Sequence, residues 1–230
     1  MPTLLQEIIP WGRTQREYEL MFALTEVDKK LKILGCGDGP ASFNAEWTAA
    51  GGNIISIDPV YEFSGAEIQA RFEAVRENIM AAVEASPEKW DWSFHKNSQD
   101  LLVNRVAALN GFLADYEAGK KAGRYQLEEL PQLSFADREF DLTLCSHLLF
   151  LYSNLLSFDF HLVSLLELCR VADEVRVFPV LDLSGNISIH LDPTCVALQE
   201  HGIKTSLEKV NYEFQKGGHQ MLRISYEKNR

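Results

Sequence analysis

A glycine-rich turn that follows a short apolar run constrains the fold of this chain more than any other feature. Residues 31–34 are apolar apart from one lysine, the turn Gly35-Cys36-Gly37-Asp38-Gly39 comes next, and residues 41–50 have helical character. Glycines between a strand and a helix let the backbone approach a ligand, and the start of the helix offers free N–H groups to an anion. A second buried strand is expected over residues 53–57, closed by Asp58-Pro59. These segments predict a β-α-β unit with a ligand site at the turn.

Two capping boxes predict helices on either side of this unit. Thr14 and Glu17 precede an apolar stripe that ends by residue 30, so residues 1–30 form an expected N-terminal helical segment. Ser64 and Glu67 open a long amphipathic helix that ends near residue 86, and apolar periodicity predicts another helix over residues 98–119. Two helices therefore stand where one crossover helix would suffice, as an insert over residues 64–123.

The remainder of the chain alternates between strands and helices. Strands are expected near Tyr125 and over residues 140–145, 174–180, 204–214 and 220–226, with helices over residues 160–171 and 193–201. The last two strands are joined by Lys216-Gly217-Gly218-His219, a turn that predicts an antiparallel hairpin. With 46% hydrophobic residues in a chain of 230, we expect one domain over residues 1–230.

Composition excludes several classes of function. The chain has 22 Lys and Arg against 33 Asp and Glu, a net charge of −11, which disfavours binding to a phosphate backbone, so no nucleic-acid partner is expected. Its four cysteines form no CxxC pair, no metal-ligand spacing occurs, and no apolar stretch is long enough for a membrane span. We expect a cytoplasmic protein with reduced thiols and no metal; the sequence implies no particular oligomeric state.

The turn is poorly suited to a pyrophosphate. The dinucleotide fingerprint G-x-G-x-x-G needs a final glycine where this chain has Pro40, and Asp38 introduces a negative charge. Asp58, 23 residues after Gly35, is placed to accept hydrogen bonds from both ribose hydroxyls of a nucleoside. A nucleoside ligand without phosphate fits this pattern, and it leaves the helix end free to take a carboxylate.

Three longer runs carry a family resemblance. The runs ILGCGDGPASFNAE, IISIDPVY and LEELPQLSFADREFDLTLCSHLLFLY resemble the successive motifs of class I S-adenosylmethionine-dependent methyltransferases, over residues 30 to 180. The stretches GPASFNAE, ADYEAGKKAGRY and YEFQKGGHQML further resemble a group of bacterial methyltransferase-like proteins. The resemblance implies a doubly wound, mainly parallel seven-stranded α/β sheet in the order 3-2-1-4-5-7-6 with the last strand antiparallel. It also implies S-adenosylmethionine as cofactor and methyl transfer by in-line displacement; we expect a small-molecule acceptor.

The resemblance also implies which residues meet the cofactor. It assigns the methionine part to Gly35, Cys36, Gly37 and Gly39, the ribose to Asp58 with Pro59 beside it, the adenine to Gln126 and Leu127, and the methyl group to the strand end Cys145-Ser146-His147. His147 is the candidate base or acceptor-orienting group, since ligands of open α/β sheets bind at the carboxyl ends of strands; the alternative is a histidine that only packs beside the cofactor. The chain departs from the family at Ile33 and Gln126, where acids are frequent.

The insert suggests where an acceptor would bind. Its linking stretch, from Trp90 to His95, either packs in the core or contacts substrate. If the two helices form a cap, together with Trp11 and Tyr18 they would enclose a pocket for a small and fairly apolar acceptor beside Asp58. Two other functions share the fold: an NAD(P)-linked oxidoreductase, and a non-catalytic S-adenosylmethionine-binding protein.

Overall fold

A seven-stranded sheet forms the centre of the protein, a computed structural model that describes residues 10–226. Its order is β3-β2-β1-β4-β5-β7-β6, and β7 runs antiparallel to both β5 and β6, whereas the other pairs are parallel. The strands are β1 (Lys32–Cys36), β2 (Asn53–Ile57), β3 (Tyr125–Gln126), β4 (Phe140–Ser146), β5 (Ala172–Phe178), β6 (Ile203–Lys209) and β7 (Gln220–Tyr226). The predicted strand order and the C-terminal hairpin are confirmed.

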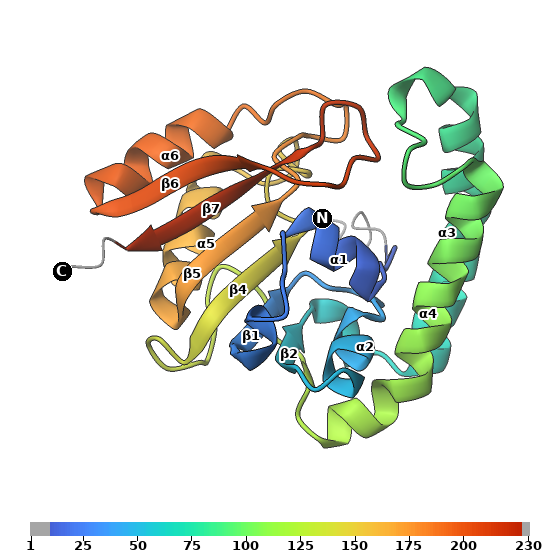
Figure 1. Ribbon diagram of the computed structural model, residues 1–230, viewed down its shortest axis with the longest axis horizontal. Helices are drawn as coiled ribbons and strands as arrows, with labels where there is room; N and C mark the ends of the chain where they lie inside the picture. The colour runs from blue at the N-terminus through green and yellow to red at the C-terminus, as the bar shows by residue number, and fades with distance from the viewer. Residues whose placement is uncertain (1–9, 227–230) are drawn as a thin grey trace.

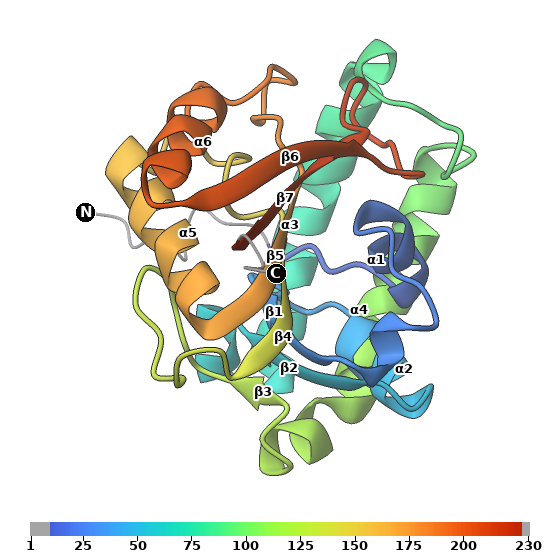
Figure 2. The same cartoon turned by 60° about the vertical axis from the view of Figure 1, so that its left-hand side comes forward.

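Helices cover both faces of the sheet (Figures 1 and 2). On one face lie α5 (Phe158–Val171) and α6 (Leu191–Glu200), and on the other lie α1 (Gln15–Met21), α2 (Phe43–Ala49) and α4 (Ser98–Lys121). Side chains of β1 alternate between these layers: Ile33 packs with α1 and α2, and Leu34 packs with α5. Both are fully buried in apolar clusters, which explains why an acid is unsuited to position 33 in this chain.

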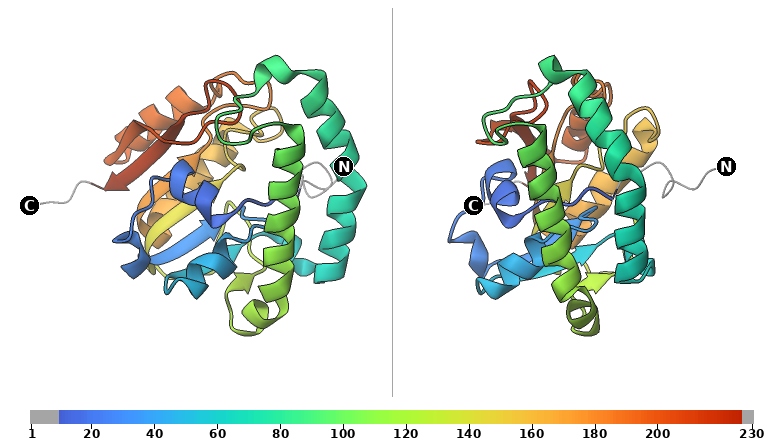
Figure 3. Two further views of the ribbon diagram at one scale, coloured as in Figure 1. Left: turned by 45° about the vertical axis from the view of Figure 1, so that its right-hand side comes forward. Right: turned by 90° about the vertical axis from the view of Figure 1, so that its right-hand side faces the viewer.

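The predicted insert is a pair of long antiparallel helices (Figure 3). Helix α3 (Gly65–Ala85) begins at the Ser64–Glu67 capping box, and α4 begins at Asn97, whose side chain accepts a hydrogen bond from the N–H of Asp100. The arrows of β4 and β5 point toward this pair in Figure 1, so the insert lies beyond the carboxyl ends of the parallel strands. That is the edge at which open α/β sheets bind ligands.

Some predicted boundaries are wrong. The strand expected over residues 204–214 ends at Lys209, because the following loop packs against the tip of the insert: Asp91 donates its N–H to the carbonyl of Phe214 at 2.7 Å. The first helix ends at Met21, before a separate short 3-10 helix at Asp28–Lys30. Strand β5 begins two residues earlier than predicted, directly after α5.

Candidate functional site

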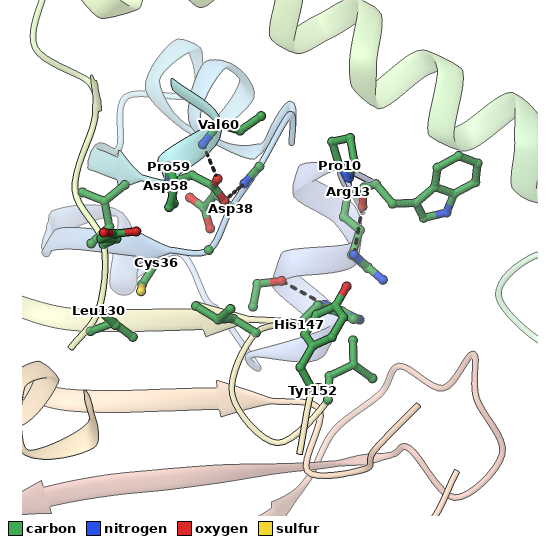
Figure 4. A pocket seen from close by; sticks show the side chains of 18 of the residues that line it. Pro10, Arg13, Cys36, Asp38, Asp58, Pro59, Val60, Leu130, His147 and Tyr152 are labelled. Atoms are coloured by element: carbon green, nitrogen blue, oxygen red, sulfur yellow. Dashed lines mark hydrogen bonds between the residues drawn. The ribbon is translucent and has the colours of Figure 1, made fainter. Parts of the chain in front are cut away.

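A cavity of about 470 Å³ opens at the carboxyl ends of β1, β2 and β4. One end is formed by the glycine turn, Asp58 and Leu130; the other is formed by His147, Tyr152 and Arg13 (Figure 4). Helix α3 supplies a wall of Arg71, Ala74, Val75 and Ile79, and Trp11 and Tyr18 add to it. The cavity therefore lies between the insert and Asp58, where the sequence predicts an acceptor pocket.

The glycines of the turn have separate structural reasons. Gly37 and Gly39 have φ of +71° and +52°, in the left-handed region that favours glycine, and both line the cavity. A Cβ on Gly35 would lie 1.9 Å from Oδ2 of Asp38, so this glycine makes room for the aspartate. Gly35 is therefore explained by the carboxyl group of Asp38, and not by the approach of a ligand.

Asp38 points into the protein, which changes the argument made from its charge. Its Oδ1 accepts a hydrogen bond from the hydroxyl of Tyr18 at 2.7 Å, and its Oδ2 accepts one from the hydroxyl of Ser56 at 2.5 Å. Burial raises the pKa of Asp38 to about 7, against the lowering effect of these two bonds. The carboxyl group is thus held beneath the turn, and its repulsion of a pyrophosphate is weaker than the sequence suggests.

Asp58 stands at the end of β2 with both oxygens directed at backbone N–H groups. Oδ2 accepts from Gly39 and Oδ1 accepts from Val60, each at 2.8 Å. Burial raises the pKa of this carboxyl to about 6 although these bonds lower it. Each carboxylate oxygen has a second lone pair. Asp58 therefore fixes the glycine turn and can still accept further hydrogen bonds from a ligand in the cavity.

His147 follows β4 with a φ of +53°, an unusual conformation for a residue other than glycine. Its backbone N–H donates to the carbonyl of Phe178 at 2.7 Å, and its Nδ1 lies 3.0 Å from the hydroxyl of Ser146. Burial, followed by the charges of Arg13 and Arg105, lowers the pKa of His147 well below its usual value. The imidazole is accordingly neutral at pH 7 and lines the cavity.

The cavity wall includes only some of the residues predicted as cofactor contacts. Cys36, Gly37, Gly39, Asp58, Pro59 and Ser146 line it together with His147. Gln126 donates its side-chain amide to the carbonyl of Gly123, and Leu127 is 56% exposed; Glu128, Glu129 and Leu130 line the cavity in their place. Cys145 is fully buried, next to Cys36 in the strand register.

Sequence reasoning also missed several residues of the wall. Arg13 and Arg71 each lack a motif context, since one precedes a capping box and the other lies within an amphipathic helix. Only the path of the chain brings them to the cavity. The aromatic stretch of the insert, in contrast, packs in the core: Trp90 stacks on Phe214 at 4.8 Å between ring centroids, and it does not line the cavity.

Across residues 10–226 no group of three or more His, Cys, Asp or Glu side chains is placed to hold a metal ion. Within those same residues, no helix has both the length and the apolar character that a membrane crossing requires.

The fold and the cavity define a class: an open, doubly wound α/β protein with a cavity at the carboxyl edge of the sheet. No family model matches the chain. It is 34% identical over 221 residues to the uncharacterized protein MJ0045 of Methanocaldococcus jannaschii, a match that covers 96% of this chain and 97% of that protein. The chain belongs to the family of this archaeal protein.

Solved structures with related folds are more distant. They include a TehB-like SAM-dependent methyltransferase from Corynebacterium glutamicum, with 14% identity, a TM-score of 0.45, and coverage of 92% of this chain and 87% of that one. A SAM dependent methyltransferase from Aquifex aeolicus has 14% identity, a TM-score of 0.40, and coverage of 86% and 81%. The magnesium protoporphyrin IX methyltransferase from Synechocystis has 12% identity, a TM-score of 0.41, and coverage of 86% and 70%. The fold class of this chain follows from its strand order.

Proposed function

We propose that this protein is an S-adenosylmethionine-dependent methyltransferase that acts on a small-molecule acceptor. The observation that carries the proposal is a single cavity that joins the glycine turn and Asp58 to His147, at the carboxyl edge of a sheet ordered 3-2-1-4-5-7-6. Each of the three motifs that resemble class I methyltransferases contributes residues to the wall of this cavity, among them Gly37, Asp58 and His147. The alternatives, an NAD(P)-linked oxidoreductase and a non-catalytic cofactor-binding protein, are separated by the experiments below.

The residues present fit S-adenosylmethionine. Asp58 has lone pairs left for ribose hydroxyls, and Pro59 and Leu130 provide apolar surface for a purine ring. Gly37 and Gly39 leave the turn without side chains where the methionine part would pass, and a Cβ on Gly37 would come within 3.0 Å of Leu148. Glu128 and Glu129 line the cavity and would lie beside the purine, where the resemblance implies Gln126 and Leu127.

The bound cofactor would supply an activated methyl group on its sulfonium. The protein's own task is then to align the acceptor with that group and to exclude water, because the displacement is in line. His147 is placed to orient the acceptor or to receive its proton. It is neutral, as a base must be, but its lowered pKa makes it a weak one, which favours the orienting role.

Equilibrium dialysis of the purified protein tests this proposal. We expect retention of S-adenosylmethionine and S-adenosylhomocysteine, and no retention of NADH, since the turn lacks the third glycine of a dinucleotide site. Retention of NADH without S-adenosylmethionine would assign the protein to the oxidoreductases. For a non-catalytic protein, tritiated methyl groups from S-adenosylmethionine would reach no compound in a small-molecule extract, although the cofactor binds.

A further inference from the structure

The segment before α1, with Gly12 and Arg13, covers the start of α2, where the sequence predicts a ligand carboxylate. The carbonyl of Arg13 accepts a hydrogen bond from the N–H of Ser42 at 3.1 Å, and a Cβ on Gly12 would lie 2.1 Å from the carbonyl oxygen of Pro40. The backbone therefore lies directly on this helix end. The N–H of Ser42 is therefore not free for a ligand.

The same segment brings a cationic side chain into the cavity. Nη1 of Arg13 donates to the carbonyl of Trp11 at 3.0 Å, and Nε is buried without a hydrogen-bond partner. Within residues 10–226, no ion pair forms between Arg13 and a carboxylate; the neighbouring acid Glu17 is paired with Arg105 at 2.8 Å instead. Nη2 likewise has no partner among the described residues, and unlike Nε it is not enclosed by the protein.

The surroundings of Arg13 favour an anion. Burial, then the charge of Arg105, lowers the pKa of Arg13, so a negative charge beside it would relieve an unfavourable environment. Figure 4 shows Arg13 at the same end of the cavity as His147 and Tyr152, away from Asp58. The acids that line the cavity lie with Asp58 at the opposite end of the site, with Glu128 and Glu129 next to Leu130.

Apolar side chains line the cavity beside this cation. Trp11 stacks on Phe72 of α3 at 4.9 Å between ring centroids, and Val75, Ile79 and Leu151 also belong to the wall. A ligand at this end would accordingly place an apolar body against α3 and a negative group on Arg13. A carboxylate can accept a charge-assisted hydrogen bond from Nη2, and one guanidinium balances one carboxylate charge.

We propose that Arg13 binds the carboxylate of a small ligand in this cavity through Nη2. The carboxylate has two sources. If it belongs to the acceptor, the acceptor is an amphipathic carboxylic acid, held with its apolar part against Trp11 and α3. If it belongs to the amino-acid end of S-adenosylmethionine, the assignment rests on the proposed function. In both cases Arg13 is a ligand-binding residue.

Isothermal titration calorimetry on the full chain tests the assignment. The proteins are the wild type, Arg13→Gln, Arg13→Lys, which keeps the charge without the fork, and the matched control Arg16→Gln, whose side chain is 68% exposed on α1. The probes are S-adenosylhomocysteine, methylthioadenosine, which has the same nucleoside without the carboxylate, 3-phenylpropionate and its uncharged amide. We expect Arg13→Gln to lower the affinity for at least one carboxylate probe about 10- to 100-fold, and Arg13→Lys to lower it less.

The pattern of losses identifies the source. If Arg13→Gln loses affinity for S-adenosylhomocysteine but not for methylthioadenosine, the carboxylate belongs to the cofactor. If it loses affinity for 3-phenylpropionate, and all variants bind the amide weakly, the carboxylate belongs to the acceptor. The inference is overturned if the wild type and Arg13→Gln bind both carboxylate probes with equal affinity, or if neither protein binds them. It is also overturned if Arg13→Gln loses as much affinity for methylthioadenosine as for S-adenosylhomocysteine. If the wild type binds neither nucleoside, the proposed function fails, and 3-phenylpropionate still decides the role of Arg13.

Discussion

The carboxyl group of Asp38 is buried beneath the glycine turn. Tyr18 and Ser56 donate hydrogen bonds to it from α1 and β2, so the aspartate joins the N-terminal helix to the second strand. The class I methyltransferases that the motifs resemble often have an acid two positions before the first glycine, where this chain has Ile33. We interpret Asp38 as the residue that supports the turn in this protein, from within the turn itself.

The raised pKa of Asp38 predicts a pH dependence of stability. At pH values between the ordinary value of 3.8 and about 7, the folded protein holds a proton that the unfolded chain releases. The stability that this proton linkage contributes is full below pH 4 and is lost as the pH rises through about 7, at about 1.4 kcal/mol per pKa unit. Asp38→Asn should flatten the fall in unfolding free energy, measured by urea titration from pH 4 to 8. Asp141→Asn, at the opposite end of the sheet, is the control; equal slopes for Asp38→Asn and wild type would contradict this account.

Asp58 is predicted to be the main polar contact of the nucleoside. Asp58→Asn keeps the size of the side chain but removes the charge that strengthens hydrogen bonds to ribose hydroxyls, so affinity for S-adenosylhomocysteine should fall about 10- to 100-fold. Calorimetry at pH 8 gives the comparison. Asp141→Asn is again the matched control, because Asp141 also accepts a backbone N–H, from Lys32 at 2.7 Å, but far from the cavity. Unchanged affinity in Asp58→Asn would remove Asp58 from the site.

A buried ionic cluster joins elements that are distant in sequence. Glu17 of α1 pairs with Arg105 of α4 at 2.8 Å and accepts a hydrogen bond from Tyr212, in the loop before β7, at 2.9 Å. Glu17 and Arg105 are almost completely buried. The cluster therefore fixes the insert and the C-terminal hairpin loop to the N-terminal helix, and it sets the position of the segment that carries Trp11 and Arg13.

Breaking this cluster should destabilise the whole protein. Glu17→Gln leaves Arg105 as an uncompensated buried charge, which costs about 3–5 kcal/mol of unfolding free energy. Removing both charges, in Glu17→Gln with Arg105→Met, should recover part of the loss. Urea unfolding of the two variants measures both effects. A loss below about 1 kcal/mol in the single variant would mean that water or a neighbouring side chain replaces the carboxylate.

Most elements could be predicted from the sequence because their signals are local. The capping boxes at Thr14 and Ser64 mark the starts of α1 and α3, and the apolar run of β2 has the predicted bounds. The Glu17–Arg105 pair spans 88 residues and the Glu17–Tyr212 bond spans 195, so no local pattern announces them. For the same reason the predicted strand is longer than β6: after Lys209, Phe214 packs against Trp90 and Trp92 of the insert, and Val210 and Tyr212 pack in the apolar cluster that includes α1.

Predictability of the site follows the same division. Asp58 and His147, at the ends of predicted strands, line the cavity, because the topology brings strand ends together. Gln126 does not line it, since a strand of two residues gives little information about where its neighbours point. Arg13 could not be found from sequence, because its role depends on how the segment before α1 crosses the start of α2.

At the scale of the whole molecule, the insert turns an open sheet edge into one side of a cavity. The carboxyl ends of β1, β2 and β4 supply the polar residues, and α3 supplies an apolar wall on the far side of the cavity. The match to the archaeal protein MJ0045 covers 96% of this chain, so it includes the insert as well as the sheet.

A crystal structure of the protein with S-adenosylhomocysteine tests the central claim most directly. We predict that the ribose hydroxyls lie within hydrogen-bond distance of Asp58, that the purine contacts Pro59 and Leu130, and that the sulfur faces the His147 end of the cavity. A ligand bound elsewhere, or no ligand in crystals grown at saturating concentration, would contradict the account.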